Sequence, residues 1–151
     1  MSRTHHPRTL FTVAPAAEAK LAPDQRDALK AWREAITLRL RREFPDYTEL
    51  GSVLFVIALI ERGGALLLET ISQRAACPED RDGRGNVRIV RELKEHGLIE
   101  VAGYGKSLIG NNGLRNLWAM TSREKALAYL RSRCEWVLAE LGIDEPQRAS
   151  A

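Results

Sequence analysis

The chain has 151 residues, 44% of them hydrophobic, which is the size and composition of one globular domain with a sizeable core. The net charge of +3 is too small to indicate a polyanionic partner by itself, so the positions of the charges must decide. The two cysteines, Cys77 and Cys134, lie far apart in the sequence, which argues against a disulfide framework or a zinc knuckle and favours a reducing, cytoplasmic location.

Two terminal segments are expected to be flexible. Residues 1–22 contain histidines, prolines and arginines but no apolar core of the kind that a signal peptide needs, so we expect a loose arm. Residues 143–151 form the expected flexible tail.

The first expected helix begins at Pro23 and ends before Pro45, which cannot continue it. Apolar side chains recur along it at helical spacing, namely Leu29, Trp32, Ile36 and Leu40. This pattern predicts a long amphipathic helix.

A second, buried helix is expected from about Leu50 to Arg62. Residues 53–60 form an unbroken apolar run, and Gly63 is suited to end the helix. Charges and glycines at 61–64 interrupt the apolar stretch well before the roughly 20 residues that span a bilayer. We therefore expect no membrane segment.

A third helix is expected from Leu66 to Ala76, with Leu67, Leu68, Ile71 and Ala75 toward the core. Pro78 stops it. The turn that follows is acidic and contains Glu79, Asp80 and Asp82.

A fourth helix is expected from about Arg84 to His96, and Gly97 is a natural left-handed residue to end it. On a helical wheel, three arginines fall within about 60° of one another: Arg84, Arg88 and Arg91. The opposite face carries Ile89, Val90 and Leu93. One face therefore suits a protein core, and the other suits the phosphates and guanine edges of duplex DNA.

We expect DNA contacts from this helix at Arg84, Asn86, Arg88, Arg91 and Lys94. Asn86 is a candidate for contacting adenine, but its wheel angle lies near the buried side. A role as the helix N-cap is equally favoured.

Two short strands, Ile99–Tyr104 and Leu117–Met120, are expected to flank a tip rich in Gly, Asn and Lys. No Asp or Glu occurs between Val101 and Arg123. The expected DNA contacts in this hairpin are Lys106, Ser107, Asn111, Asn112 and Arg115. Glycine and asparagine are common in any hairpin tip, so the tip alone favours a plain solvated loop. Its position directly after the arginine-faced helix favours a DNA-binding wing.

The last expected helix begins at a capping box formed by Thr121 and Glu124 and ends at Gly142. Its seam consists of Leu127, Leu130, Cys134, Val137 and Leu141. We expect this seam to pair with Leu29, Trp32, Ile36 and Leu40 of the first helix across a two-fold axis in a homodimer. The alternative is that the two sets pack against each other within one chain.

This order of helix, turn, arginine-faced helix, hairpin and capped helix predicts a winged helix-turn-helix. Residues 84–100 resemble the recognition helix of the MarR family of regulators, which ends in L-x-x-x-G-L-I/V, here Leu93 to Ile99. Residues 117–126 resemble the opening of the helix that follows the wing in that family. The resemblance implies a homodimer built from the terminal helices, a palindromic operator and, in some members, a small-molecule effector.

Motifs that suggest chemistry are incomplete. Gly105-Lys106-Ser107 resembles the end of a phosphate-binding loop, but Glu100 stands where that motif needs glycine, and no helix is expected to follow. His5 and His6 have no third ligand nearby. We expect no enzyme activity, no cofactor and no metal.

These observations predict a mainly α protein with a small β-hairpin. A single winged-helix domain at 23–142 is expected to combine a helical dimerisation part, at 23–62 and 122–142, with a DNA-binding part at 65–121. The expected function is sequence-specific duplex-DNA binding by a dimeric transcriptional repressor. The alternative is a winged-helix adaptor that contacts proteins in a replication, phage or plasmid assembly, with the acidic turn 79–82 as its docking element.

Overall fold

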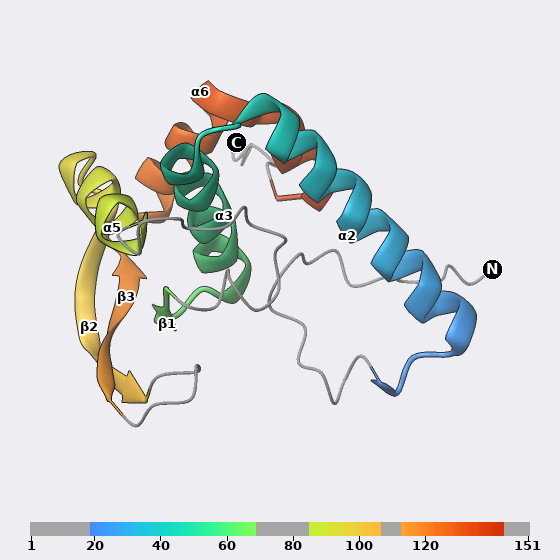
Figure 1. Cartoon of the computed structure of the whole chain (residues 1–151), viewed down its shortest axis with the longest axis horizontal. Coiled ribbons are helices and arrows are strands. Elements are labelled where there is room, and N and C mark those ends of the chain that lie inside the picture. Colours follow the sequence, from blue (N-terminus) through green and yellow to red (C-terminus); the bar gives the residue numbers. More distant parts are fainter. Residues whose placement is uncertain (1–18, 69–84, 107–112, 144–151) are drawn as a thin grey trace, which may run out of the picture.

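The computed structural model describes residues 19–68, 85–106 and 113–143. In these parts the chain is mainly helical, with four helices and one three-stranded antiparallel sheet. Helix α3 lies at the centre, between α2 and α6 on one side and α5 with the sheet on the other (Figure 1). None of the helices in these described ranges has the length and apolarity needed to cross a membrane.

Helix α2 spans Pro23–Glu43, as the sequence predicts. Proline suits the first helical position because its missing N–H has no partner there in any case. The backbone N–H of Ala22 donates to the Gln25 side chain at 3.0 Å, which fixes the first turn.

Helix α3 spans Tyr47–Arg62 and begins three residues earlier than predicted. The carboxylate of Asp46 caps it by accepting from the Glu49 N–H at 3.1 Å. Every residue from 50 to 60 is buried, which explains the unbroken apolar run. Gly63 ends the helix with a φ of 75°, a left-handed conformation that favours glycine.

Strand β1 spans Leu66–Leu67, so the prediction that a helix begins at Leu66 is wrong. These two residues pair with Trp118 and Leu117 of strand β3 instead. A short apolar run fits a buried strand and a buried helix equally well, and here pairing with β3 stabilises the strand. The rest of that expected helix and the acidic turn 79–82 lie outside the described residues.

Helix α5 spans Gly85–Glu95. The Gly97 N–H donates to the Lys94 carbonyl, and the Leu98 N–H donates to the Leu93 carbonyl, both at 2.9 Å. Gly97 has a φ of 67°. This closing motif is the one predicted at Gly97, and it turns the chain directly into the sheet.

Strands β2, at Ile99–Lys106, and β3, at Leu114–Met120, form a hairpin that we call the ribbon. Both are longer than predicted. The sheet order is β1-β3-β2, so β3 is central. A bulge between Val101 and Gly103 shifts the register of the ribbon partway along its length.

Helix α6 spans Arg123–Leu141, and its cap differs from the prediction by one residue. Ser122, rather than Thr121, accepts from the Lys125 N–H, at 3.2 Å. The Thr121 hydroxyl instead donates to the Gly97 carbonyl at 2.6 Å, while its N–H donates to the Leu98 carbonyl at 3.0 Å. Thr121 therefore ties the end of β3 to the turn after α5 and is not available as the cap.

The residues expected at a dimer surface are largely covered within one chain. Seven are buried and two are half-buried: Leu29, Ile36, Leu40, Leu130, Cys134, Val137 and Leu141, then Trp32 and Leu127. All except Leu29 belong to the core or pack against it. The seam is thus covered in the single chain, which fits the alternative of packing within one chain, and the homodimer stays a prediction.

Polar contacts also join α2 to α6. The Trp32 indole N–H donates to Glu140 at 3.1 Å, and the Trp136 indole N–H donates to Glu43 at 2.8 Å. The Arg39 guanidinium lies 3.8 Å from the centre of the Trp136 ring. Both tryptophans of this layer thus have their polar atoms satisfied inside the chain.

Candidate nucleic-acid interface

Helix α5 separates a core face from an exposed face. Ile89 and Leu93 are fully buried, as predicted, and Val90 is only half-buried. The opposite side is solvent-exposed and consists of Val87, Arg88, Arg91, Lys94 and Glu95. Three exposed cations therefore lie on the side of this short helix opposite Ile89 and Leu93.

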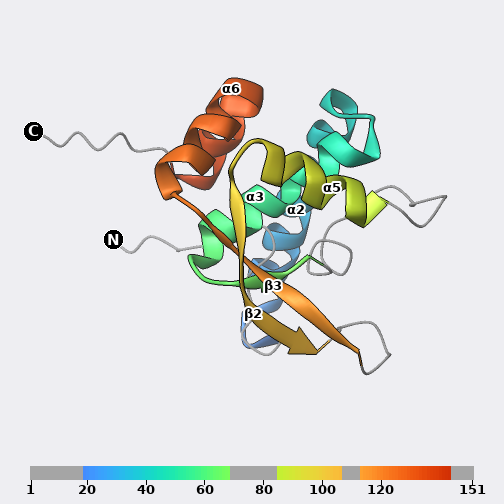
Figure 2. The ribbon, with the colours of Figure 1, turned by 90° about the vertical axis from the view of Figure 1, so that its left-hand side faces the viewer.

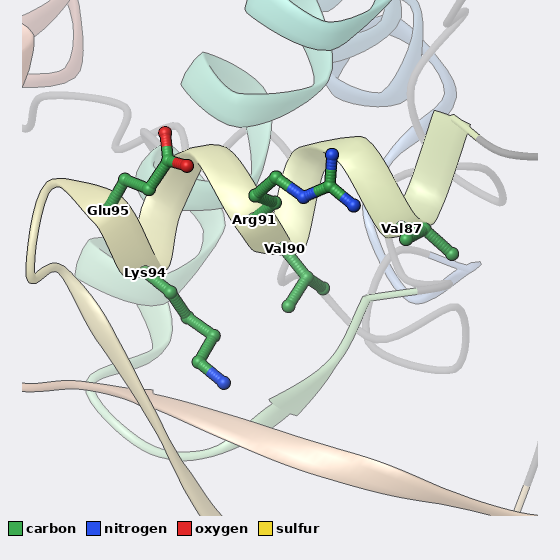
Figure 3. Close-up of a pocket in the computed structure, with 5 residues that line it drawn as sticks. All are labelled: Val87, Val90, Arg91, Lys94 and Glu95. Atoms are coloured by element: carbon green, nitrogen blue, oxygen red, sulfur yellow. The ribbon is translucent and has the colours of Figure 1, made fainter.

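A pocket of about 390 Å³ lies along this exposed side, lined by Val87, Val90, Arg91, Lys94 and Glu95. Val87, Val90 and Lys94 point toward the strands, and Glu95 points the other way (Figure 3). The part of the pocket that faces the sheet is therefore apolar with a lysine at its edge. Its only carboxylate is turned away from the ribbon.

Lys94 connects α5 to the ribbon. Its Nζ lies 5.9 Å from the centre of the Trp118 ring, within the range of a cation–π contact. We call the side of the ribbon that carries Trp118 the Trp118 face. Because side chains alternate along a strand, Leu114 and Asn116 share this face with Trp118. Helix α5 and the ribbon lie on the same side of the molecule, facing the viewer in Figure 2.

The pairing register places the two cations of the ribbon on opposite faces. Lys106 pairs with Leu114, so it lies on the Trp118 face together with Tyr104, which pairs with Asn116. Arg115 pairs with Gly105 and lies on the other face. Both predicted contacts therefore lie on the ribbon, but their side chains belong to opposite faces. The bulge and the extra strand length set this register, and the pattern of residue types did not predict either of them.

The Glu92 carboxylate of α5 contacts His96 and Arg133. Glu92 lies 3.1 Å from the His96 ring nitrogen and 3.7 Å from the Arg133 guanidinium of α6. Arg133 also lies 4.3 Å from the centre of the Tyr129 ring. This cluster partly neutralises Glu92 on the flank of α5 that faces α6, away from the ribbon.

Some of the predicted contacts fall in parts of the chain that the structure does not describe. Arg84, Ser107, Asn111 and Asn112 lie outside the described residues. Asn86 is the second residue of α5, which puts it inside the helix rather than at its cap, and its side chain is also outside the described part.

Helix α6 contains two buried ionisable groups, Tyr129 and Cys134. Burial raises the pKa of Tyr129 to about 12 and that of the Cys134 thiol to about 12. A thiol with this pKa is protonated and inert at neutral pH. Among the described residues, no three His, Cys, Asp or Glu side chains gather as a metal site would require. Cys77, His5 and His6 lie outside those residues.

The sequence did not predict that large apolar residues of α5 and the ribbon are exposed. Val87 on α5 is 59% exposed, and Tyr104 and Leu114 on the ribbon are 68% and 67% exposed. Apolar residues are normally assigned to a core, so their types gave no signal. The spacing of Val87 four residues before Arg91 does place it on the cationic face and would have identified it.

Comparisons of the chain with protein-family models, with curated proteins and with solved structures found no match. The resemblance of residues 84–100 and 117–126 to MarR regulators therefore stays a prediction. Function must be inferred from α5 and the ribbon themselves.

Proposed function

We propose that this chain binds duplex DNA as a winged helix-turn-helix protein, with α5 in the major groove and the ribbon as the wing. The observation that carries the proposal is the Lys94–Trp118 contact. It joins the cationic side of α5 to a ribbon face that lies within an acid-free stretch of sequence. One continuous surface thereby presents a helix and a hairpin together to a polyanion.

The dimensions of α5 suit this role. Its 11 residues make a helix about 16 Å long, and the major groove, about 12 Å wide, admits one α-helix. Arg91 and Lys94 can contact phosphates or guanine edges, whereas Val87 in the first turn suits the methyl group of thymine. The exposed side of α5 thus offers contacts for affinity and for specificity.

Transcriptional repression by promoter occlusion is the regulatory function that we propose. It rests on the resemblance to MarR regulators, as does a palindromic operator. Because the seam of α2 and α6 is covered within one chain, a homodimer would need other residues of these helices. An effector bound in the pocket along α5 would compete directly with DNA.

Binding of random-sequence duplex, measured by fluorescence anisotropy, tests the proposal. The double variant Arg88→Glu/Arg91→Glu should bind about 100-fold more weakly than the parent chain. Arg26→Glu/Lys30→Glu on α2 makes the same charge change at exposed positions and is the matched control, for which only a small loss is expected. Affinity should also fall steeply with salt as counterions are released.

Two results would count against the proposal. Equal losses in the two double variants would mean that net charge, and not α5, determines binding. No binding of any duplex at low salt would favour the protein-contact adaptor instead.

A further inference from the structure

The outer half of the ribbon exposes two large apolar side chains side by side. Tyr104 pairs with Asn116 and Lys106 pairs with Leu114, so all four side chains lie on the Trp118 face. Tyr104 and Leu114 are diagonal neighbours in this arrangement, and each is more than two-thirds exposed. Large apolar groups exposed together on a narrow hairpin indicate a contact surface.

Tyr104 is flanked by two glycines. It stands between Gly103, which has a φ of 143°, and Gly105, where an added Cβ would lie 3.4 Å from the Leu117 side chain. The φ of Gly103 favours glycine, whereas a side chain at 105 would make a close but ordinary contact with Leu117. The bulge that precedes Gly103 changes the direction in which the following side chains point.

The distance of this pair from α5 is of the same order as the spacing of DNA grooves. Leu114 is four residues from Trp118, or about 13 Å along the strand at the usual rise per residue. Trp118 in turn lies under Lys94 of α5. Half a helical turn of DNA, which separates a major groove from the adjacent minor groove, is roughly 17 Å. With α5 in the major groove, Tyr104 and Leu114 would reach the next minor groove.

Charge favours DNA as the partner of this surface. No Asp or Glu occurs between residues 101 and 123, and Lys106 is a direct neighbour of both apolar side chains. Proteins that bind the minor groove insert apolar side chains of this kind between base pairs and thereby kink the duplex.

We infer that Tyr104 and Leu114 insert into the minor groove, unstack one base step and bend the bound DNA. This inference rests on the proposed DNA binding and adds a specificity that no base contact supplies. Pyrimidine–purine steps unstack most easily, so preferred sites should place a TA or CA step where the ribbon lands.

The test uses the full chain and a duplex selected by it from a random pool. Bending is measured by energy transfer between dyes at the two ends, and unstacking by 2-aminopurine placed along the site. The parent chain should bend the duplex and raise the 2-aminopurine fluorescence at one step. Tyr104→Ala/Leu114→Ala should abolish both signals while weakening binding only about three- to tenfold, since α5 still holds the DNA.

Leu38→Ala, which shortens an exposed leucine of α2, is the control and should leave bending unchanged. Circular dichroism should show that all variants keep the parent fold. The inference is overturned if the parent binds without bending, or if the double variant bends the duplex equally well. Absence of any duplex binding would overturn the proposed function as well, so the two failures are distinguishable.

Discussion

The α2–α6 layer buries or pairs its large side chains, whereas the side of α5 and the ribbon exposes them. In the α2–α6 layer, Trp32 and Trp136 donate hydrogen bonds to Glu140 and Glu43, and the apolar seam is covered. On the side of α5 and the ribbon, arginine, lysine, valine, tyrosine and leucine side chains are exposed together. The first arrangement satisfies its groups within the chain. The second exposes cationic and apolar side chains on one side of the molecule, which is the surface that we propose for DNA.

The largest expected effect is the difference in stability lost when a buried leucine or an exposed leucine is shortened to alanine. Leu130 on α6 is fully buried, so Leu130→Ala should lower the free energy of unfolding by about 2–5 kcal/mol. Leu114→Ala on the ribbon should change it by less than about 0.5 kcal/mol. Denaturant unfolding measures both. Similar losses in the two variants would mean that the ribbon is part of the stabilising core.

The next largest effect is a loss of folding stability at alkaline pH, caused by two buried groups of α6. Burial holds the pKa of Tyr129 and of Cys134 at about 12 in the folded chain, above their ordinary values of 10.0 and 9.0. Between roughly pH 9 and 12 the unfolded chain therefore releases protons that the folded chain keeps. The free energy of unfolding is unaffected below this window and falls as pH rises through it, by up to about 1.4 kcal/mol per pH unit for each group.

Denaturant unfolding at pH 7 and pH 11 checks this expectation. Tyr129→Phe removes one of the two groups and should make the loss between these pH values smaller than in the parent. An identical loss in parent and variant would show that the Tyr129 hydroxyl does not couple folding to pH.

A smaller effect concerns the one carboxylate that lines the pocket on α5. Glu95→Gln removes a negative charge from the proposed DNA surface and should raise affinity for duplex by about two- to fivefold. Glu135→Gln makes the same change at an exposed position of α6 and should have less effect. Anisotropy titrations at one salt concentration compare them, and a larger gain from Glu135→Gln would place the DNA on the other side of the molecule.

Much of the helical framework could be predicted from the sequence because its signals are local. Pro23, Gly63, Gly97 and Gly142 each mark a helix boundary through their own backbone preference. Leu66 was assigned to a helix because a short apolar run shows neither helical nor strand periodicity. Its strand conformation depends on pairing with β3. Thr121 resembled a cap until its contact with Gly97, distant in the sequence, was known.

The interface was harder to predict because it depends on register. The core face of α5 followed from helical spacing. The division of Lys106 and Arg115 between two faces followed from a bulge and from pairing across the hairpin, which single residues do not encode. Exposure of Tyr104 and Leu114 has the same origin. Residue types alone could therefore locate the cationic helix but not the shape of the surface beside it.

The three tryptophans allow the most direct test that DNA binds to the side of α5 and the ribbon. Each indole N–H gives one signal in a nitrogen–proton NMR spectrum, and Trp→Phe variants assign the three. On titration with duplex DNA, the Trp118 signal should shift, because its ring lies under Lys94, while the signals of Trp32 and Trp136 keep their positions in the α2–α6 layer. Shifts confined to Trp32 and Trp136, with Trp118 unchanged, would contradict the proposed interface.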